Sequence, residues 1–72
     1  MGKRTQKLGN HLREFRQSRE GMTQQELADR VGVTRQTVIA IEANRYSPSL
    51  EVAFMIARAL GAKIEDIFFF DG

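Results

Sequence analysis

The chain has 72 residues, of which 42% are hydrophobic and 28% are charged, and it contains no cysteine. This length supports one hydrophobic core, and the composition is that of an ordinary globular domain. The lack of cysteine excludes a disulfide framework and a cysteine-based zinc site. No apolar run is long enough to span a membrane, and the first residues lack the hydrophobic stretch of a secretory signal. We therefore expect a cytoplasmic protein with one domain.

Charge is distributed unevenly along the chain. Residues 1–36 contain eight basic and four acidic residues, a net charge of +4, whereas residues 37–72 carry a net charge of −2. Such asymmetry is compatible with a face that binds nucleic acid. By charge alone, a solvated surface of mixed charge is the favoured interpretation, and the basic segment 1–7 is interpreted as a tail rather than as an arm that touches DNA.

Two helices are predicted in the N-terminal half. The first covers residues 8–18, where three apolar residues recur at helical spacing, namely Leu8, Leu12 and Phe15. The second begins with the capping box Thr23-x-x-Glu26, in which each side chain satisfies the free backbone N–H of the other residue. Gly32 ends the second helix, because glycine tolerates the left-handed conformation that a sharp turn requires.

A third helix follows directly after this turn. Thr34 is a good N-cap residue, and Val38 and Ile41 are the expected buried positions. Ala28 is small where the third helix must pass close to the second. Two short helices joined by a glycine-containing turn are typical of a helix-turn-helix motif, which we place at residues 23–42.

A fourth helix is predicted to end at about Leu60, before Gly61. Either Ser47 or Ser49 can cap its start. The residues expected to face inward are Leu50, Ala53, Phe54, Ala57 and Leu60. A short fifth helix is predicted at residues 64–68.

The motif residues resemble the lambda repressor/Cro (XRE) helix-turn-helix family over residues 8–68. The resemblance is carried by Gln24-Gln25-Glu26-Leu27-Ala28, by Gly32-Val33-Thr34-Arg35-Gln36-Thr37-Val38, and by Ile41-Glu42, Tyr46, Pro48-Ser49-Leu50 and Ile56-Ala57. It is greatest to the small stand-alone bacterial members. It implies an all-α fold of five helices and a dimeric repressor of transcription. We expect one domain over residues 1–72, in which the C-terminal end can form a short extended segment.

The resemblance also implies which residues contact DNA. The residues expected to contact base edges are Arg35, Gln36, Thr37 and Ala40. The residues expected to contact phosphates are Thr23, Gln24, Thr34, Asn44, Arg45 and Tyr46. The chemistry is suitable, because arginine can bind guanine and glutamine can bind adenine through two hydrogen bonds each, and an alanine methyl can contact thymine. For Tyr46, packing on the fourth helix is an equal alternative.

Family members form a partly buried ion pair at the positions of Arg16 and Glu42. In this chain one residue, which we take to be Glu20, is inserted between the first helix and Gly21. The register of Arg16 is therefore open, and a surface position is the alternative.

The C-terminal segment 62–72 is expected to form the dimer interface. The candidate interface residues are Met55, Ile64, Ile67, Phe68, Phe69 and Phe70. A short fifth helix can turn only one face onto its own core, and the remaining phenylalanines would leave an exposed apolar patch, which usually marks an interface. The alternative is that the last residues fold back as a strand against residues 3–7.

Catalysis finds no support, because His11 is the only histidine and no nucleophile–base pair is evident. No cofactor and no metal site are expected. We expect the chain to bind double-stranded operator DNA as a homodimer and not to contact a membrane. The first alternative is an antitoxin that binds both a toxin protein and its own operator. The second alternative is a protein–protein module that reuses the fold without DNA.

Overall fold

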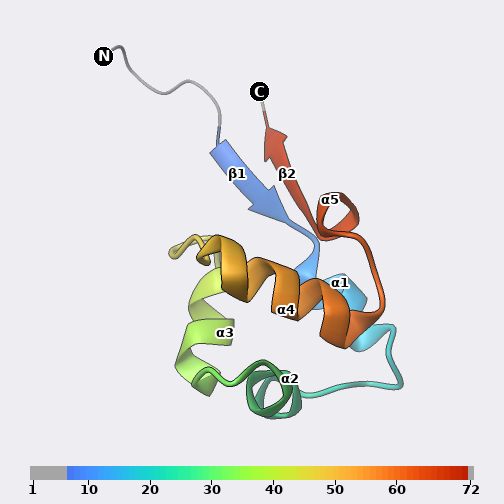
Figure 1. The fold of residues 1–72 in the computed structure, drawn as a ribbon. Helices are drawn as coiled ribbons and strands as arrows, with labels where there is room; N and C mark the ends of the chain where they lie inside the picture. Colours follow the sequence, from blue (N-terminus) through green and yellow to red (C-terminus); the bar gives the residue numbers. More distant parts are fainter. Residues whose placement is uncertain (1–6, 72) are drawn as a thin grey trace.

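The structure is a computed structural model and describes residues 7–71. It contains five helices and two short strands (Figure 1). In chain order these are β1 (Lys7–Asn10), α1 (Leu12–Gln17), α2 (Gln24–Val31), α3 (Arg35–Glu42), α4 (Leu50–Leu60), α5 (Ile64–Ile67) and β2 (Phe68–Asp71). The five predicted helices are therefore present, and a small sheet is added to them. Of the basic segment 1–7, all but Lys7 lies outside the described residues.

The hydrophobic core lies between the helices, and each of them contributes to it. The most deeply buried side chains are Leu12, Leu27, Val38, Ile41, Ile56, Leu60 and Ile67. Packing of an apolar stripe supplies most of the stability of such short helices, because helices of this length are marginal by themselves.

The inward face predicted for α4 is wrong at two positions. Leu50 and Phe54 are 72% and 59% exposed. The buried stripe of α4 consists of Ala53, Ile56, Ala57 and Leu60. At about 100° per residue, Phe54 lies more than a quarter turn away from the centre of that stripe. An apolar ridge of α4 therefore faces away from the core. Ser49, and not Ser47, caps the helix by accepting the Val52 N–H at 3.2 Å.

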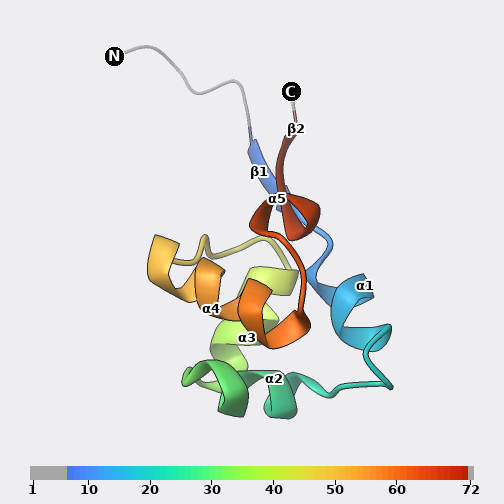
Figure 2. The same ribbon diagram turned by 45° about the vertical axis from the view of Figure 1, so that its right-hand side comes forward.

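The predicted first helix is wrong over residues 8–10, which belong to a strand. β1 and β2 pair antiparallel, with Leu8 opposite Phe70 and Gly9 opposite Phe69. The resulting two-stranded ribbon extends from the helical body at the end opposite α2 (Figures 1 and 2). The last residues thus fold back as a strand, which was the alternative to the dimer interface, and this strand pairs with residues 7–10. Of the expected pairing segment 3–7, only Lys7 is among the described residues.

Gly9 and Asn10 explain why a strand replaces the start of the helix. The ring of Phe69 lies over Gly9 so closely that a β-carbon there would come within 2.6 Å of it. Asn10 donates to the Ile41 carbonyl at 3.0 Å and accepts the Leu12 N–H at 3.1 Å. Because the Asn10 side chain satisfies a free N–H at the start of α1, the helix begins at residue 12.

Arg16 of α1 is buried, and its partners lie on two other segments. Its Nε donates to Glu42 Oε2 at 2.7 Å, and its Nη2 donates to Glu42 Oε1 at 3.1 Å. Its Nη1 donates to the Met22 carbonyl at 2.8 Å. The structure thus places Arg16 in the ion pair that the resemblance implies, in spite of the inserted residue. Gly21, with a φ of 70°, and Glu20, with a φ of 57°, form the turn that accommodates the insertion.

Candidate nucleic-acid interface

The motif at residues 23–42 folds as two helices joined by a tight turn. The capping box is present: Glu26 N–H donates to Thr23 Oγ1 at 3.0 Å, and Thr23 N–H donates to Glu26 Oε1 at 2.8 Å. Because of the bond from the Thr23 backbone, the pKa of the Glu26 carboxyl is held below its ordinary value of 4.5. Gly32 ends α2 with a φ of 85°, a conformation that favours glycine.

The first turn of α3 presents polar side chains to solvent. Thr34 caps the helix by accepting the Thr37 N–H at 3.2 Å, and the hydroxyl oxygens of these two threonines lie 3.0 Å apart. Arg35 and Gln36 are exposed. Val38 and Ile41 anchor the opposite side of α3 in the core. One side of α3 is therefore packed in the core, while its first turn is accessible to a ligand.

A shallow hollow of about 290 Å³, here called the α3 hollow, lies beside this turn. It is lined by Thr34, Gln36, Thr37, Ala40 and Tyr46. The structure thus brings together three of the four residues expected to contact bases with two of those expected to contact phosphates. Tyr46 is exposed and borders α3 at this point.

Arg35 lies on the other flank of α3. It borders a second, more polar hollow of about 570 Å³, here called the α2 hollow, at the start of α2. This hollow is lined by Arg13, Arg16, Gln17, Gly21, Met22, Thr23, Gln24, Gln25, Arg35 and Glu42. Three arginines and one glutamate give it a positive charge, and the N-terminus of α2 adds a partial positive charge. Such a hollow is suited to an anion.

Gln24 is less free than the sequence suggests. It is half-buried, and its amide nitrogen donates to Glu42 Oε1 at 3.1 Å. Sequence reasoning missed Arg13 and Gln25 as neighbours of this site. Arg13 precedes Arg16 by three residues, so that both lie on the same side of α1. That spacing, together with the expected pair between Arg16 and Glu42, is the signal that could have identified Arg13.

The loop after α3 is fixed by a helix-ending motif. Asn44 adopts a left-handed conformation with a φ of 63°. Its N–H donates to the Ile41 carbonyl at 2.9 Å, and the Arg45 N–H donates to the Ala40 carbonyl at 2.9 Å. These two bonds form a Schellman motif. Asn44 therefore has a structural role, and Arg45 is held exposed just beyond the end of α3.

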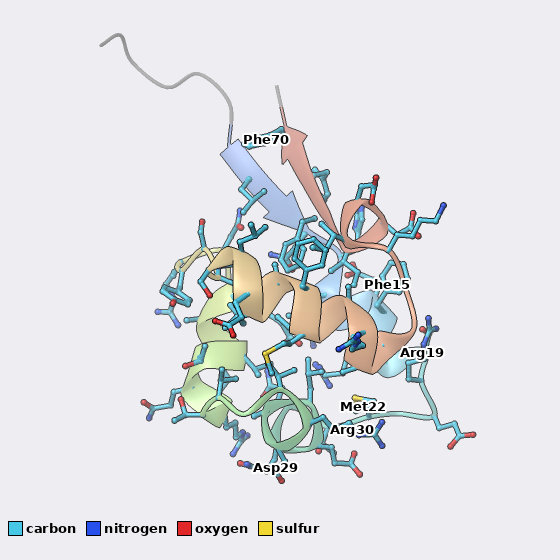
Figure 3. All side chains as sticks on the ribbon, in the orientation of Figure 1. Phe15, Arg19, Met22, Asp29, Arg30 and Phe70 are labelled. Atoms are coloured by element: carbon cyan, nitrogen blue, oxygen red, sulfur yellow. The ribbon has the colours of Figure 1, made fainter. Side chains whose placement is uncertain are left out.

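The structure buries some of the residues expected at a dimer interface and leaves others exposed. Ile67 and Phe68 are buried in the core of the chain itself, so their assignment to an interface is wrong. Ile67 ends α5 and Phe68 begins β2, and both side chains belong to the core cluster of the chain, so neither is left for a partner. Phe69 lies against Gly9 and His11, whose ring centroid is 4.6 Å from its own. The exposed members are Met55, Phe69 and Phe70, while Ile64 is half-buried. In Figure 3, Phe70 lies on the part of the ribbon distant from the helices.

A family model described as helix-turn-helix matches residues 12–67. A protein from Archaeoglobus fulgidus is 53% identical over 64 residues, which are 89% of this chain and 90% of that protein. One from Methanothermobacter thermautotrophicus is 69% identical over 52 residues, 71% of this chain and 75% of its own length. The YgzD protein of Bacillus subtilis is 47% identical over 64 residues, 89% of this chain and 96% of its own length. All three are described as uncharacterized HTH-type transcriptional regulators.

The chain therefore belongs to the helix-turn-helix family of transcriptional regulators, of the XRE type. This confirms the resemblance and the non-enzymatic class of the protein. The expected bacterial character is not confirmed, because the relatives are largely archaeal. Within residues 7–71, no helix has the length and apolar character needed to cross a membrane.

Proposed function

We propose that the protein represses transcription by binding a near-palindromic operator as a homodimer, with α3 in the major groove. The observation that carries this proposal is the exposed first turn of α3, where Arg35 and Gln36 project from a helix that is anchored by Val38 and Ile41. Arginine and glutamine are the side chains that bind guanine and adenine edges through paired hydrogen bonds. Repression follows when the bound protein excludes polymerase from the DNA.

Contacts on both sides of α3 would position the helix on the DNA backbone. The positive α2 hollow supports a phosphate contact at Thr23 and Gln24, with Arg13 added to the expected set. On the other side, Arg45 is exposed beyond the end of α3, next to Asn44. The ribbon does not interfere, because it extends from the end of the molecule opposite α2 (Figure 2).

The dimer contact is best supported on α4. Leu50, Phe54 and Met55 are exposed and border one apolar hollow of about 790 Å³. The other lining residues of this α4 hollow are Ala57, Arg58, Ala62, Lys63, Ile64 and Glu65. Small monomers rarely expose contiguous apolar surface of this kind.

A second copy of the chain fits the α4 hollow in chemical terms. In a two-fold contact the same patch of both copies meets, so the patch must complement itself. Here a projecting ring, Phe54, adjoins a hollow, and the rim carries both signs of charge in Arg58, Lys63 and Glu65. The proposed interface keeps Met55 and Ile64 from the expected set and adds Leu50 and Phe54. Neither the family nor the names of the relatives favours a toxin as partner. Because the proposed target is chromosomal DNA, the proposed location of the protein is the cytoplasm.

Selection of bound sequences from random duplex DNA tests the function directly. We expect two symmetric half-sites about one helical turn apart, because each subunit places one α3 in the major groove on the same side of the DNA. The affinity should be about 10⁻⁸ M or tighter at physiological salt. Recovery of no preferred sequence, or of a single site without symmetry, would contradict the proposal of an operator-binding dimer.

A further inference from the structure

The motif that ends α4 does not satisfy the last carbonyl of the helix. Gly61 ends α4 with a φ of 65°. The Gly61 N–H donates to the Arg58 carbonyl at 3.2 Å, and the Ala62 N–H donates to the Ala57 carbonyl at 3.0 Å. The last carbonyls of a helix have no partner within the helix itself. The carbonyl of Leu60 therefore needs a donor from another segment.

Arg19, in the turn that follows α1, supplies this donor. Its Nε donates to the Leu60 carbonyl at 2.7 Å, and its Nη1 donates to Ser18 Oγ at 3.0 Å. The guanidinium also lies over the Phe15 ring, 5.6 Å from the ring centroid, and Figure 3 labels both side chains on the same side of the molecule. A positive charge at the C-terminal end of a helix is favourable. Because Ser18 and Phe15 hold the guanidinium in place, the bond to Leu60 has a fixed direction.

The same short segment also holds the end of α3. Arg16, three residues before Arg19, makes the two bonds to Glu42 at the last position of α3. The Arg19 N–H donates to the Arg16 carbonyl at 3.1 Å, so the two arginines belong to one turn of backbone. Hydrogen bonds from a charged donor are stronger than neutral ones. Residues 16–19 thus connect the end of the proposed recognition helix with the end of α4.

The end of α4 leads directly into one wall of the α4 hollow. Ala62, Lys63, Ile64 and Glu65, which follow α4, all line this hollow. In the proposed dimer the two copies meet here across a two-fold axis. A shift of this wall relative to α3 is repeated in both copies and changes the distance between the two α3 helices. That distance must match about one helical turn of DNA.

We infer that Arg19 is a positioning residue for the recognition of two half-sites, because it fixes the α4 hollow relative to α3 and so sets the separation of the two recognition helices. This inference rests on the proposed function. Arg19 lines neither the α2 hollow nor the α3 hollow nor the α4 hollow. Its effect on DNA binding is therefore expected to pass through the end of α4.

The test compares operators that differ only in the spacing of their half-sites. The selected operator, versions with one base pair added or removed between the half-sites, and a single half-site are each titrated at constant salt. The wild type should prefer one spacing. Arg19→Met should bind that operator about ten-fold more weakly, the effect of losing one hydrogen bond from a charged donor. Its affinity for the single half-site should change little, and its preference for one spacing should become smaller.

Three variants separate positioning from the loss of charge or of stability. Arg30→Met removes the same charge from an exposed position in the last turn of α2. Gly9→Ala perturbs the ribbon, where the new β-carbon would meet Phe69. Both should keep the spacing preference of the wild type. Arg19→Lys should recover most of that preference, because its ammonium can still donate to the Leu60 carbonyl.

The outcomes distinguish the inference from the function on which it rests. If the wild type prefers one spacing and Arg19→Met keeps that preference, the role of Arg19 is contradicted while the operator-binding dimer stands. Equal losses of Arg19→Met on the operator and on the half-site also contradict it. If the wild type prefers no spacing, the proposed dimer fails and the inference fails with it.

A milder variant covers the case in which Arg19→Met does not fold. Ser18→Ala removes the hydroxyl that accepts the Arg19 Nη1 hydrogen bond and leaves the bond to Leu60 in place. It should weaken the spacing preference in the same direction but by less. An unchanged preference in Ser18→Ala would then contradict the inference.

Discussion

Arg16 of α1 donates hydrogen bonds to both carboxylate oxygens of Glu42, the last residue of α3. The side chains of both partners are almost fully buried, at 9% and 7% exposure. A bidentate ion pair fixes the relative orientation of the two side chains as well as the distance between them. The pair therefore holds the C-terminal end of the proposed recognition helix on α1, while Gln24 ties the same carboxylate to the start of α2.

The ion pair makes a specific prediction for stability. Arg16→Met should lower the free energy of unfolding by about 3–5 kcal/mol, because it leaves the Glu42 carboxylate buried without its partner. The double variant Arg16→Met/Glu42→Leu should lose less than the single variant, since no buried charge remains. Urea unfolding measures both. Unchanged stability of Arg16→Met would mean that the pair does not hold in solution.

A second prediction concerns the contact between Gly9 and Phe69. Gly9→Ala should destabilise the chain by about 1 kcal/mol, because the new β-carbon must displace the Phe69 ring from Gly9 and from His11. The same substitution in a Phe69→Ala background should be neutral or stabilising, since alanine suits a strand better than glycine does. A double-mutant cycle of thermal unfolding measures the coupling. Equal effects of Gly9→Ala in both backgrounds would show that the ring does not lie over the glycine.

The capping box predicts a dependence of stability on pH. The pKa of Glu26 is lowered in the folded state by the Thr23 backbone N–H. Its contribution is therefore fully present above its unfolded pKa of about 4.5 and is lost as the pH falls through the lower folded pKa. Glu26→Gln removes the titrating group. Between about pH 5.5 and about pH 3, the melting temperature of the wild type should fall further than that of Glu26→Gln, and parallel curves would argue against the effect.

The proposed dimer predicts that substitutions of two exposed phenylalanines, Phe54 and Phe70, have different effects on the oligomeric state. Phe54→Ser should convert the dimer to a monomer in sedimentation and weaken binding to the full operator, because it removes the ring that enters the partner's α4 hollow. Phe70→Ser, a change of the same kind at a side chain that is 65% exposed, should leave the dimer intact. A dimer that survives Phe54→Ser but not Phe70→Ser would place the interface on the ribbon instead.

Local features were predictable from the sequence. The capping box of Thr23 and Glu26, the N-cap Thr34 and the turn at Gly32 involve residues within a few positions of each other, and the structure has them where the sequence indicates. Such signals depend on backbone groups left free at helix ends, which short polar side chains and glycine satisfy in few ways.

Features that depend on distant partners were not predictable. Leu8, Leu12 and Phe15 have helical spacing, yet Leu8 is in a strand because β1 pairs with residues more than fifty positions later. The exposure of Leu50 and Phe54 was missed for a related reason. Apolar side chains are counted alike in a periodic pattern, whereas only the arrangement of the neighbouring helices determines which of them face outward.

The central claim is that the first turn of α3 recognises sequence, and a comparison of Arg35→Ala with Arg45→Ala tests it most directly. Affinities of both variants are measured on the selected operator and on random duplex over a range of salt concentrations. Arg35→Ala should lose about 1–3 kcal/mol on the operator, lose little on random DNA and relax the preference at one base pair. Arg45→Ala should weaken both DNAs alike and reduce the salt slope by about one unit. Equal losses on operator and random DNA for Arg35→Ala would contradict the assignment of α3 as the recognition helix.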